Sequence, residues 1–237
     1  MIERTIEFAS PDGPVPGWEA VRDGGAERAV VVIQEAFGLN DHIRDVAGRF
    51  ASAGYHAVAP NLFHRAGGGT APYDDIAQTA PLFKGLRDET VLADVGAALG
   101  HLRDAGHADG AIGVIGFCIG GRFSFLVALE RGLGAAVTLY GGSIVSSKMP
   151  KFQPLVDRAG ELRTPWLGLY GDRDEAIPTD DVERLRAATA AAPVPTEIIR
   201  YPEAGHGFFC DAREAFHPAS AADAWERVLG WFDRRLG

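Results

Sequence analysis

Cys118 lies in the segment of the chain best suited to chemistry. The sequence reads GFCIGG over 116–121, directly after the apolar run 111–116 and before 122–130, which is compatible with a helix. A nucleophile flanked by glycines between a strand and a helix is typical of a nucleophile elbow, whose strained turn exposes the side chain. The start of the helix favours a thiolate and directs the N–H of Ile119 toward a developing oxyanion. The alternative interpretation is a buried structural cysteine in a glycine-rich turn.

An acid and a histidine follow in the order that a hydrolytic triad requires. Segment 171–178 reads GDRDEAIP and segment 203–208 reads EAGHGF, each directly after an apolar run that suits a strand. Nucleophile, acid and histidine in this chain order are expected of α/β-hydrolases. His206 would accept the thiol proton, and Asp174 would fix the tautomer of its imidazole. Asp172 is the competing choice for the acid.

The elements that must position these residues alternate between strands and helices. Short apolar runs suit strands that are covered on both faces, as in a parallel sheet. Helical spacing of apolar residues separates them, which predicts right-handed βαβ units and functional groups on loops at the carboxyl ends of the strands. We therefore predict one α/β domain over 1–237, a doubly wound, mostly parallel sheet with helices on both faces. The expected strands are 2–8, 29–34, 55–59, 111–116, 135–140, 166–170 and 195–201, and the clearest helices are 88–105 and 219–235.

Composition narrows the class of partner. The 237 residues carry a formal net charge of -9, which disfavours nucleic acid and anionic membranes because both are bound by clustered cations.

Two cysteines are too few for a disulfide framework and indicate a reducing compartment, so a cytoplasmic location is expected. No apolar run is long enough to cross a bilayer. The histidines show no metal-binding spacing, so we expect no metal. We also expect no cofactor, and a monomer or weak homodimer.

A further segment identifies a resemblance to a known family. Residues 34–40 read QEAFGLN, and together with GFCIGG, GDRDEAIP and EAGHGF they resemble the dienelactone hydrolase (carboxymethylenebutenolidase) family over roughly residues 2–235. The resemblance implies an α/β-hydrolase fold and a triad of Cys118, Asp174 and His206. It also implies that the N–H groups of Ala36 and Ile119 form the oxyanion hole.

Glu35 has two possible roles. In the family that the chain resembles, the glutamate of this segment sits against the nucleophile and takes part in forming the thiolate. A carboxylate at the end of a buried strand is costly to leave without a partner. The alternative interpretation is therefore a structural ion pair, for which Arg44 and Arg122 are the candidates.

The expected pocket departs from the family. Dienelactone enzymes bind the substrate carboxylate with two arginines, but the position four residues after His206 is Cys210, and 66–86 contains no arginine. Both thiols would then border one pocket. Segment 141–163 is long for a connection and is expected to form a pocket edge. The candidate substrate-binding residues are Phe37, Phe83, Tyr140, Phe208, Cys210 and Arg213, with Lys84, Arg87, Lys148 and Lys151 as further possible anion contacts.

The sequence thus predicts a cysteine-dependent hydrolase of a small ester or lactone that acts through an acyl-thioenzyme. A second hypothesis is a noncatalytic hydrolase-fold protein in which Cys118 senses oxidants or electrophiles. The first is favoured because a sensor has no evident need for an acid and a histidine at the triad positions.

Overall fold

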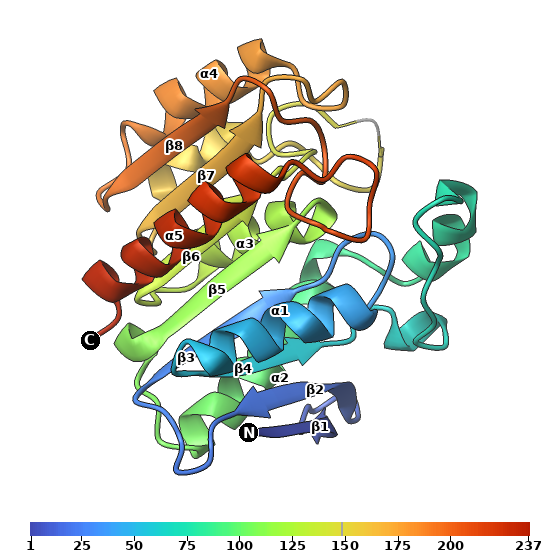
Figure 1. The fold of residues 1–237 in the computed structure, drawn as a ribbon, viewed down its shortest axis with the longest axis vertical. Helices are drawn as coiled ribbons and strands as arrows, with labels where there is room; N and C mark the ends of the chain where they lie inside the picture. The colour runs from blue at the N-terminus through green and yellow to red at the C-terminus, as the bar shows by residue number, and fades with distance from the viewer. Residues whose placement is uncertain (148) are drawn as a thin grey trace.

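The strands of the chain form one twisted sheet. The computed structural model describes residues 1–147 and 149–237. Within them an eight-stranded sheet has the order β1-β2-β4-β3-β5-β6-β7-β8 (Figure 1). β1 pairs antiparallel with β2 and β2 antiparallel with β4, whereas the other neighbours are parallel. The strands are β1 (Ile2–Phe8), β2 (Val15–Val21), β3 (Arg28–Ile33), β4 (Tyr55–Pro60), β5 (Ile112–Phe117), β6 (Ala135–Leu139), β7 (Trp166–Gly171) and β8 (Thr196–Tyr201).

Helices cover both faces of this sheet, as the sequence predicts. α1 and α5 lie on the face toward the viewer in Figure 1, and α2, α3 and α4 lie behind it, which is the arrangement that right-handed crossovers give for this strand order. The α-helices are α1 (Asp41–Ser52), α2 (Asp88–Asp104), α3 (Ile119–Glu130), α4 (Thr179–Thr189) and α5 (Pro218–Arg235). Short 3₁₀ helices are η1 (His64–Ala66), η2 (Ile76–Phe83), η3 (Asp109–Ala111) and η4 (Val156–Glu161).

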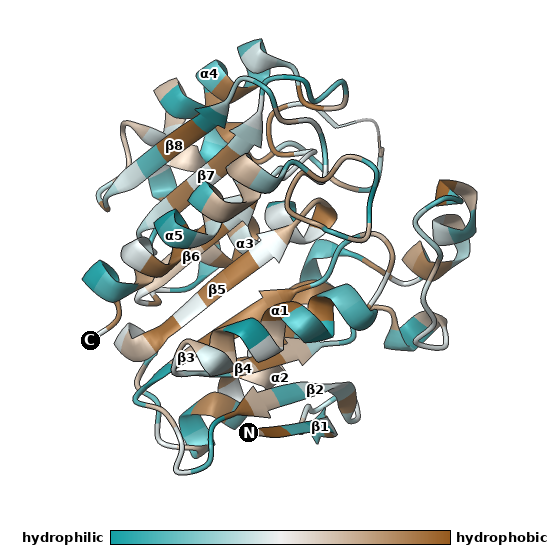
Figure 2. Ribbon diagram, viewed as in Figure 1, coloured by the Kyte–Doolittle hydropathy of each residue, from teal (hydrophilic) through white to brown (hydrophobic). Residues whose placement is uncertain are grey.

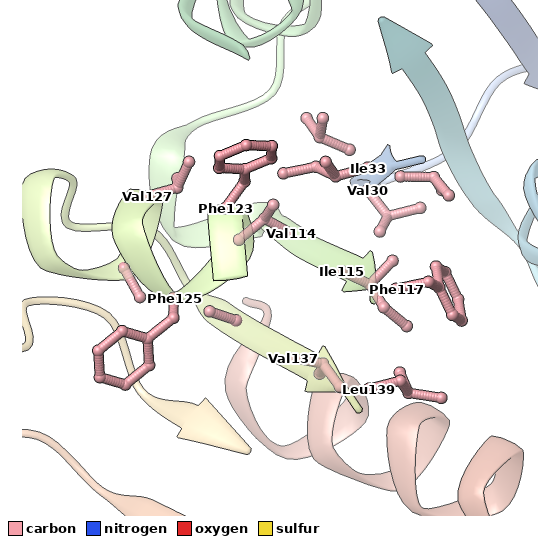
Figure 3. Packing of buried hydrophobic residues seen from close by; sticks show 14 of the residues in the cluster. Val30, Ile33, Val114, Ile115, Phe117, Phe123, Phe125, Val127, Val137 and Leu139 are labelled. Carbon is pink, nitrogen blue, oxygen red and sulfur yellow. The ribbon is translucent and has the colours of Figure 1, made fainter. Parts of the chain in front are cut away.

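The core consists of the central parallel strands and the helices against them. All six residues of β5 are buried, and Phe123 of α3 lies beside Val114 and Ile33, with Val127 further along the same helix (Figure 3). In Figure 2 the hydrophobic colour runs along β3 and β5, whereas the outward surfaces of α1 and α5 carry many hydrophilic residues. Full burial of a large aliphatic or aromatic side chain contributes about 1.5–3 kcal/mol. The carboxyl ends of these strands are therefore a rigid base for functional loops.

Several predicted elements match closely, and one strand was missed. The seven strands expected from apolar runs are present within one residue at each end, and so are the two helices. β2 has the sequence VPGWEAV, in which proline, glycine and glutamate hide the apolar alternation. In the part of the chain that the structure describes, no helix combines the length and apolarity needed to cross a membrane.

Candidate active site

Cys118 occupies a sharp, strained turn between β5 and α3. Its backbone has φ 54° and ψ -119°, a conformation that is unfavourable for a residue with a side chain. The turn is possible because its neighbours are glycines. A Cβ on Gly116 would lie 1.9 Å from the carbonyl oxygen of Gly120, and one on Gly120 would lie 2.3 Å from that of Gln34. The geometry is that of the nucleophile elbow predicted from the sequence.

His206 connects Cys118 to a buried acid. Its Nε2 lies 3.1 Å from the Cys118 Sγ, and its Nδ1 lies 2.7 Å from Oδ2 of Asp174. The other carboxylate oxygen of Asp174 accepts hydrogen bonds from the backbone N–H groups of Ala176 and Ile177, at 2.8 and 3.2 Å. These donors fix the carboxylate, and the carboxylate in turn orients the imidazole. The three residues come from the loops after β5, β7 and β8.

Asp172, the competing acid, points elsewhere. Its Oδ1 accepts a hydrogen bond of 2.6 Å from Nε of Arg200, and the side chain is part of a surface ion pair. Of the two aspartates in this loop, Asp174 is the one in contact with His206.

The site favours charge separation between the cysteine and the histidine. Burial disfavours the charged imidazolium, but the negative charge at Cys118 and the hydrogen bond to Asp174 outweigh it and raise the pKa of His206 to about 10. Phenol and imidazole rings meet edge to face, with Tyr140 and His206 centroids 5.2 Å apart. The arrangement suits a thiolate–imidazolium pair that is partly shielded from solvent.

The segment after β3 lies against the start of α3. A Cβ on Gly120 would meet the carbonyl oxygens of both Gln34 and Ile33, so the two backbones are in close contact. Ala36 and Ile119, the two residues predicted to supply oxyanion N–H groups, belong to these adjoining segments and are both buried. Ile119 is the first residue of α3, where backbone N–H groups have no partner within the helix.

Glu35 is paired with Arg213. The carboxylate is fully buried, and Nη1 of Arg213 lies 3.5 Å from its Oε1. Neither carboxylate oxygen has a hydrogen-bond partner among the described residues. The two ion-pair candidates from the sequence are wrong, because Arg44 lies near Asp41 and Arg122 binds Asp88. The sequence predicts Arg213 only as a substrate contact, because no local pattern links it to Glu35, which lies far away along the chain.

Arg122 instead organises the segment expected at the pocket edge. It is fully buried, forms a two-pronged ion pair with Asp88, and donates to the carbonyl oxygens of Ser143 and Gln153. This one side chain therefore ties segment 141–163 to α3 and to the start of α2. A small cavity between residues 141–146 and the loop that carries Ala176 and Ile177 borders that segment.

Cys210 lies in the same buried cluster as Glu35. The thiol is fully buried, close to the Tyr73 hydroxyl. Burial raises the pKa of Cys210, the Tyr73 hydroxyl opposes this, and the Glu35 carboxylate raises it further. The thiol is therefore protonated near neutral pH and poorly suited to be a second nucleophile. Negative charge on either thiol would raise the pKa of the buried Tyr140 phenol.

The other predicted substrate-binding residues divide into two groups. Phe37 lies beneath the Arg213 guanidinium, and Phe208 is buried against Tyr140, whose ring in turn meets that of His206. Phe83 instead packs on Phe63, in the segment that projects beyond the end of β4 at the right of Figure 1. Among the possible anion contacts, Lys151 donates to the Phe83 carbonyl, Lys84 and Arg87 are exposed, and Lys148 lies outside the described residues.

Tyr73 is a site residue that sequence reasoning missed. Its hydroxyl accepts a hydrogen bond of 2.9 Å from Asn40, and its ring packs on Phe37 and under Arg213. Tyr73, Arg213 and Glu175 line a surface pocket of about 780 Å³. The only local signal was Asn40, the last residue of the QEAFGLN segment, which also caps α1 by accepting from the N–H of Ile43.

The mostly parallel sheet, helices on both faces and an ordered nucleophile, acid and histidine at strand ends define an α/β-hydrolase. Comparison with known proteins narrows the class. Residues 17–236 match the family model described as "Dienelactone hydrolase family". This chain belongs to the dienelactone hydrolase family.

Individual relatives agree with this assignment. The chain is 37% identical to "Putative carboxymethylenebutenolidase" of Methylorubrum extorquens, over 98% of this chain and 81% of that protein. It is 33% identical to "Carboxymethylenebutenolidase" of Rhodococcus opacus, over 94% of this chain and 87% of that protein. The crystal structure of "Putative Dienelactone Hydrolase" from Klebsiella pneumoniae is similar with a TM-score of 0.90 and 38% identity, covering 98% of each chain. The chain is therefore a dienelactone hydrolase-like enzyme.

Proposed function

We propose that the protein hydrolyses a small ester or lactone through a covalent acyl-thioenzyme on Cys118. The observation that carries this proposal is the continuous contact from Cys118 Sγ to His206 Nε2 at 3.1 Å and from His206 Nδ1 to Asp174 at 2.7 Å. A thiolate is the nucleophilic form of cysteine, and the raised pKa of His206 favours the thiolate–imidazolium pair.

Acylation uses the Cys118 thiolate, the His206 imidazolium and two backbone N–H groups. The Cys118 thiolate attacks the acyl carbon of the substrate, and the carbonyl electron pair moves onto the oxygen. The N–H groups of Ala36 and Ile119 stabilise this oxyanion. As the carbonyl reforms, the carbon–oxygen bond to the leaving group breaks, and the imidazolium of His206 gives its proton to the departing alkoxide. A lactone opens to a hydroxyacyl thioester that remains attached.

Deacylation reverses the roles. Neutral His206 accepts a proton from water, whose oxygen attacks the thioester carbon. The second tetrahedral intermediate collapses with cleavage of the carbon–sulfur bond. A carboxylic acid leaves, and the thiolate and imidazolium are restored. The Asp174 carboxylate stabilises the imidazolium in the orientation that its two backbone donors impose.

Glu35 is proposed to assist formation of the thiolate. Its carboxylate is buried, lacks hydrogen bonds and is held by a single long contact to Arg213. Burying a carboxylate without hydrogen bonds is costly, so a nearby proton donor would stabilise it. Substrate that engages Arg213 would free Glu35 to act on the thiol.

Two cysteine variants test the proposal against a matched control. Cys118→Ala should abolish hydrolysis of activated aryl esters and small lactones, whereas Cys210→Ala should retain it. Circular dichroism and thermal unfolding establish that both variants fold. Undiminished steady-state hydrolysis by Cys118→Ala would sink the mechanism. A reactive Cys118 in a wild-type protein that turns over no ester, lactone or thioester would instead support the sensing role.

A further inference from the structure

A second group of chemically capable side chains lies far from the triad. Glu19 on β2, His56 on β4 and His101 on α2 place one ligand atom each within 4.8 Å of one another. Glu19 and His56 are buried, and the His101 side chain is 30% exposed. β3 is parallel to both β4 and β5, so these strands point in the same direction. His56 is near the start of β4, whereas Cys118 follows the end of β5, so the cluster lies at the opposite end of the strands from Cys118.

The carboxylate of Glu19 divides its two oxygens between different partners. Oε2 accepts from the Arg4 guanidinium, whose Nη2 and Nε lie at 2.6 and 2.7 Å. Oε1 faces two imidazole nitrogens, Nε2 of His56 at 2.9 Å and Nε2 of His101 at 2.7 Å. Arg4 is largely exposed and holds the carboxylate from outside. Oε1 and the two nitrogens therefore converge on one point inside the cluster.

Hydrogen bonding fixes which nitrogen of His56 carries a lone pair. Nδ1 of His107 lies 3.3 Å from the carbonyl oxygen of Glu27, which can only accept, so this Nδ1 carries the hydrogen. Nε2 of His107 is then an acceptor for the Nδ1–H of His56, at 3.1 Å. Neutral His56 is left with a lone pair on Nε2 that points at Glu19 Oε1, another acceptor. Two acceptors 2.9 Å apart repel each other unless a cation lies between them.

We propose that Glu19, His56 and His101 bind a divalent transition-metal ion of the Zn²⁺ class. Two imidazoles and a carboxylate are a common ligand set for such ions, with a fourth position left for water. A metal-binding histidine usually donates a hydrogen bond through its other ring nitrogen, which fixes the orientation of the ring. The hydrogen bond from His56 to His107, which itself donates to a backbone carbonyl, has this role. Metal–ligand distances of about 2.0–2.2 Å require Glu19 Oε1 to separate from each of the two nitrogens by roughly half an ångström. The partly exposed His101 supplies both that movement and an entry path.

The bound ion would act as a structural clamp. β2 joins the parallel part of the sheet by its antiparallel pairing with β4, and α2 packs on β4 in this region. One ion would tie the three elements together without touching the catalytic residues. Local sequence spacing predicted no metal, because the three ligands come from positions 19, 56 and 101 and meet only in the folded chain.

Cobalt binding tests the proposal directly. The full chain with Cys118→Ala, which removes the triad thiol as a competing ligand, is stripped with a chelator and titrated with Co²⁺. We expect one ion per chain, a visible ligand-field spectrum without a thiolate band, and displacement by Zn²⁺. His101→Gln in the same background should weaken binding at least about 100-fold, and His107→Gln about 10- to 100-fold. His217→Gln, a histidine change outside the cluster, should leave the affinity unchanged.

Two results would overturn the proposal. One is a folded parent chain that binds no Co²⁺ and gains no thermal stability from Zn²⁺. The contacts between Glu19 and the two histidines would then be ordinary hydrogen bonds. The other is binding that His101→Gln and Glu19→Gln leave intact, which would place the ion elsewhere. Because His101 is partly exposed, its variant should fold even where the change at buried Glu19 does not. Neither result bears on the ester or lactone hydrolysis proposed above.

Discussion

Replacement of Asp174 by asparagine changes one atom at the centre of the proposed triad. The retained Oδ1 can still accept from the N–H groups of Ala176 and Ile177. The new NH₂ group would replace Oδ2, which lies 2.7 Å from Nδ1 of His206. Two N–H donors cannot face each other at that distance, so the imidazole takes the other tautomer. Its Nε2 then carries a hydrogen toward Cys118 and cannot accept the thiol proton.

The size of the loss follows from this change of tautomer. In a serine triad, the corresponding change lowers kcat about 10⁴-fold. A thiol is more acidic than a hydroxyl and depends less on its base. We therefore expect Asp174→Asn to lower kcat by about 10²- to 10⁴-fold, a barrier increase of roughly 3–5 kcal/mol. Because the shape of the side chain is kept, the variant should remain folded.

Asp172→Asn is the matched control from the same loop. This change removes one partner of a surface ion pair with Arg200, which contributes about 0–1 kcal/mol. Steady-state hydrolysis of an aryl ester, measured beside thermal unfolding, should show normal kcat for this variant. Equal losses in the two variants, or a folded Asp174→Asn protein with kcat within tenfold of the parent, would refute the assignment of the acid.

His206 and Gly120 carry further predictions. Cys118→Ala should lower the pKa of His206 by roughly one to three units, because the thiolate that favours the imidazolium is gone; imidazole NMR measures this, and a value still near 10 contradicts it. In the parent enzyme kcat/KM should fall as the pH rises through about 10, where His206 loses the proton that it gives to the leaving group, and a decline that begins near neutrality would oppose this role. Gly120→Ala should destabilise the fold by about 1–3 kcal/mol in urea unfolding, because its Cβ would lie 2.3 Å from the Gln34 carbonyl oxygen. Gly96→Ala, in open space on α2, should instead stabilise it by about 1 kcal/mol, and equal effects would contradict the packing argument.

The sequence predicts the parallel strands and the triad well because both are local signals. The strand at 112–117 is a continuous apolar run, and the glycines around Cys118 are needed by the turn itself. β2 was missed because a glycine at position 17, where a Cβ would lie 2.3 Å from the Phe8 ring, interrupts the alternation for a packing reason. The need for a glycine at position 17 becomes clear only when β1, which carries Phe8, is paired with β2.

Contacts between distant segments were not predictable. The partner of Glu35 comes from position 213, and Tyr73 reaches the same cluster from an irregular loop. Neither residue lies in a motif or at a periodic position. The gathering of Glu19, His56 and His101 is of the same kind. In each case the strand order and the packing of a helix or loop on the sheet create the proximity.

The most direct test of the account is the capture of the acyl-enzyme. Rapid acid quench of the enzyme during turnover of an activated ester, followed by peptide mass spectrometry, should find the acyl group on the peptide that contains Cys118. The peptide with Cys210 should remain unmodified, since that thiol is buried and protonated. An acyl group on another residue, or full turnover by a Cys118→Ala protein, would contradict nucleophilic catalysis by Cys118.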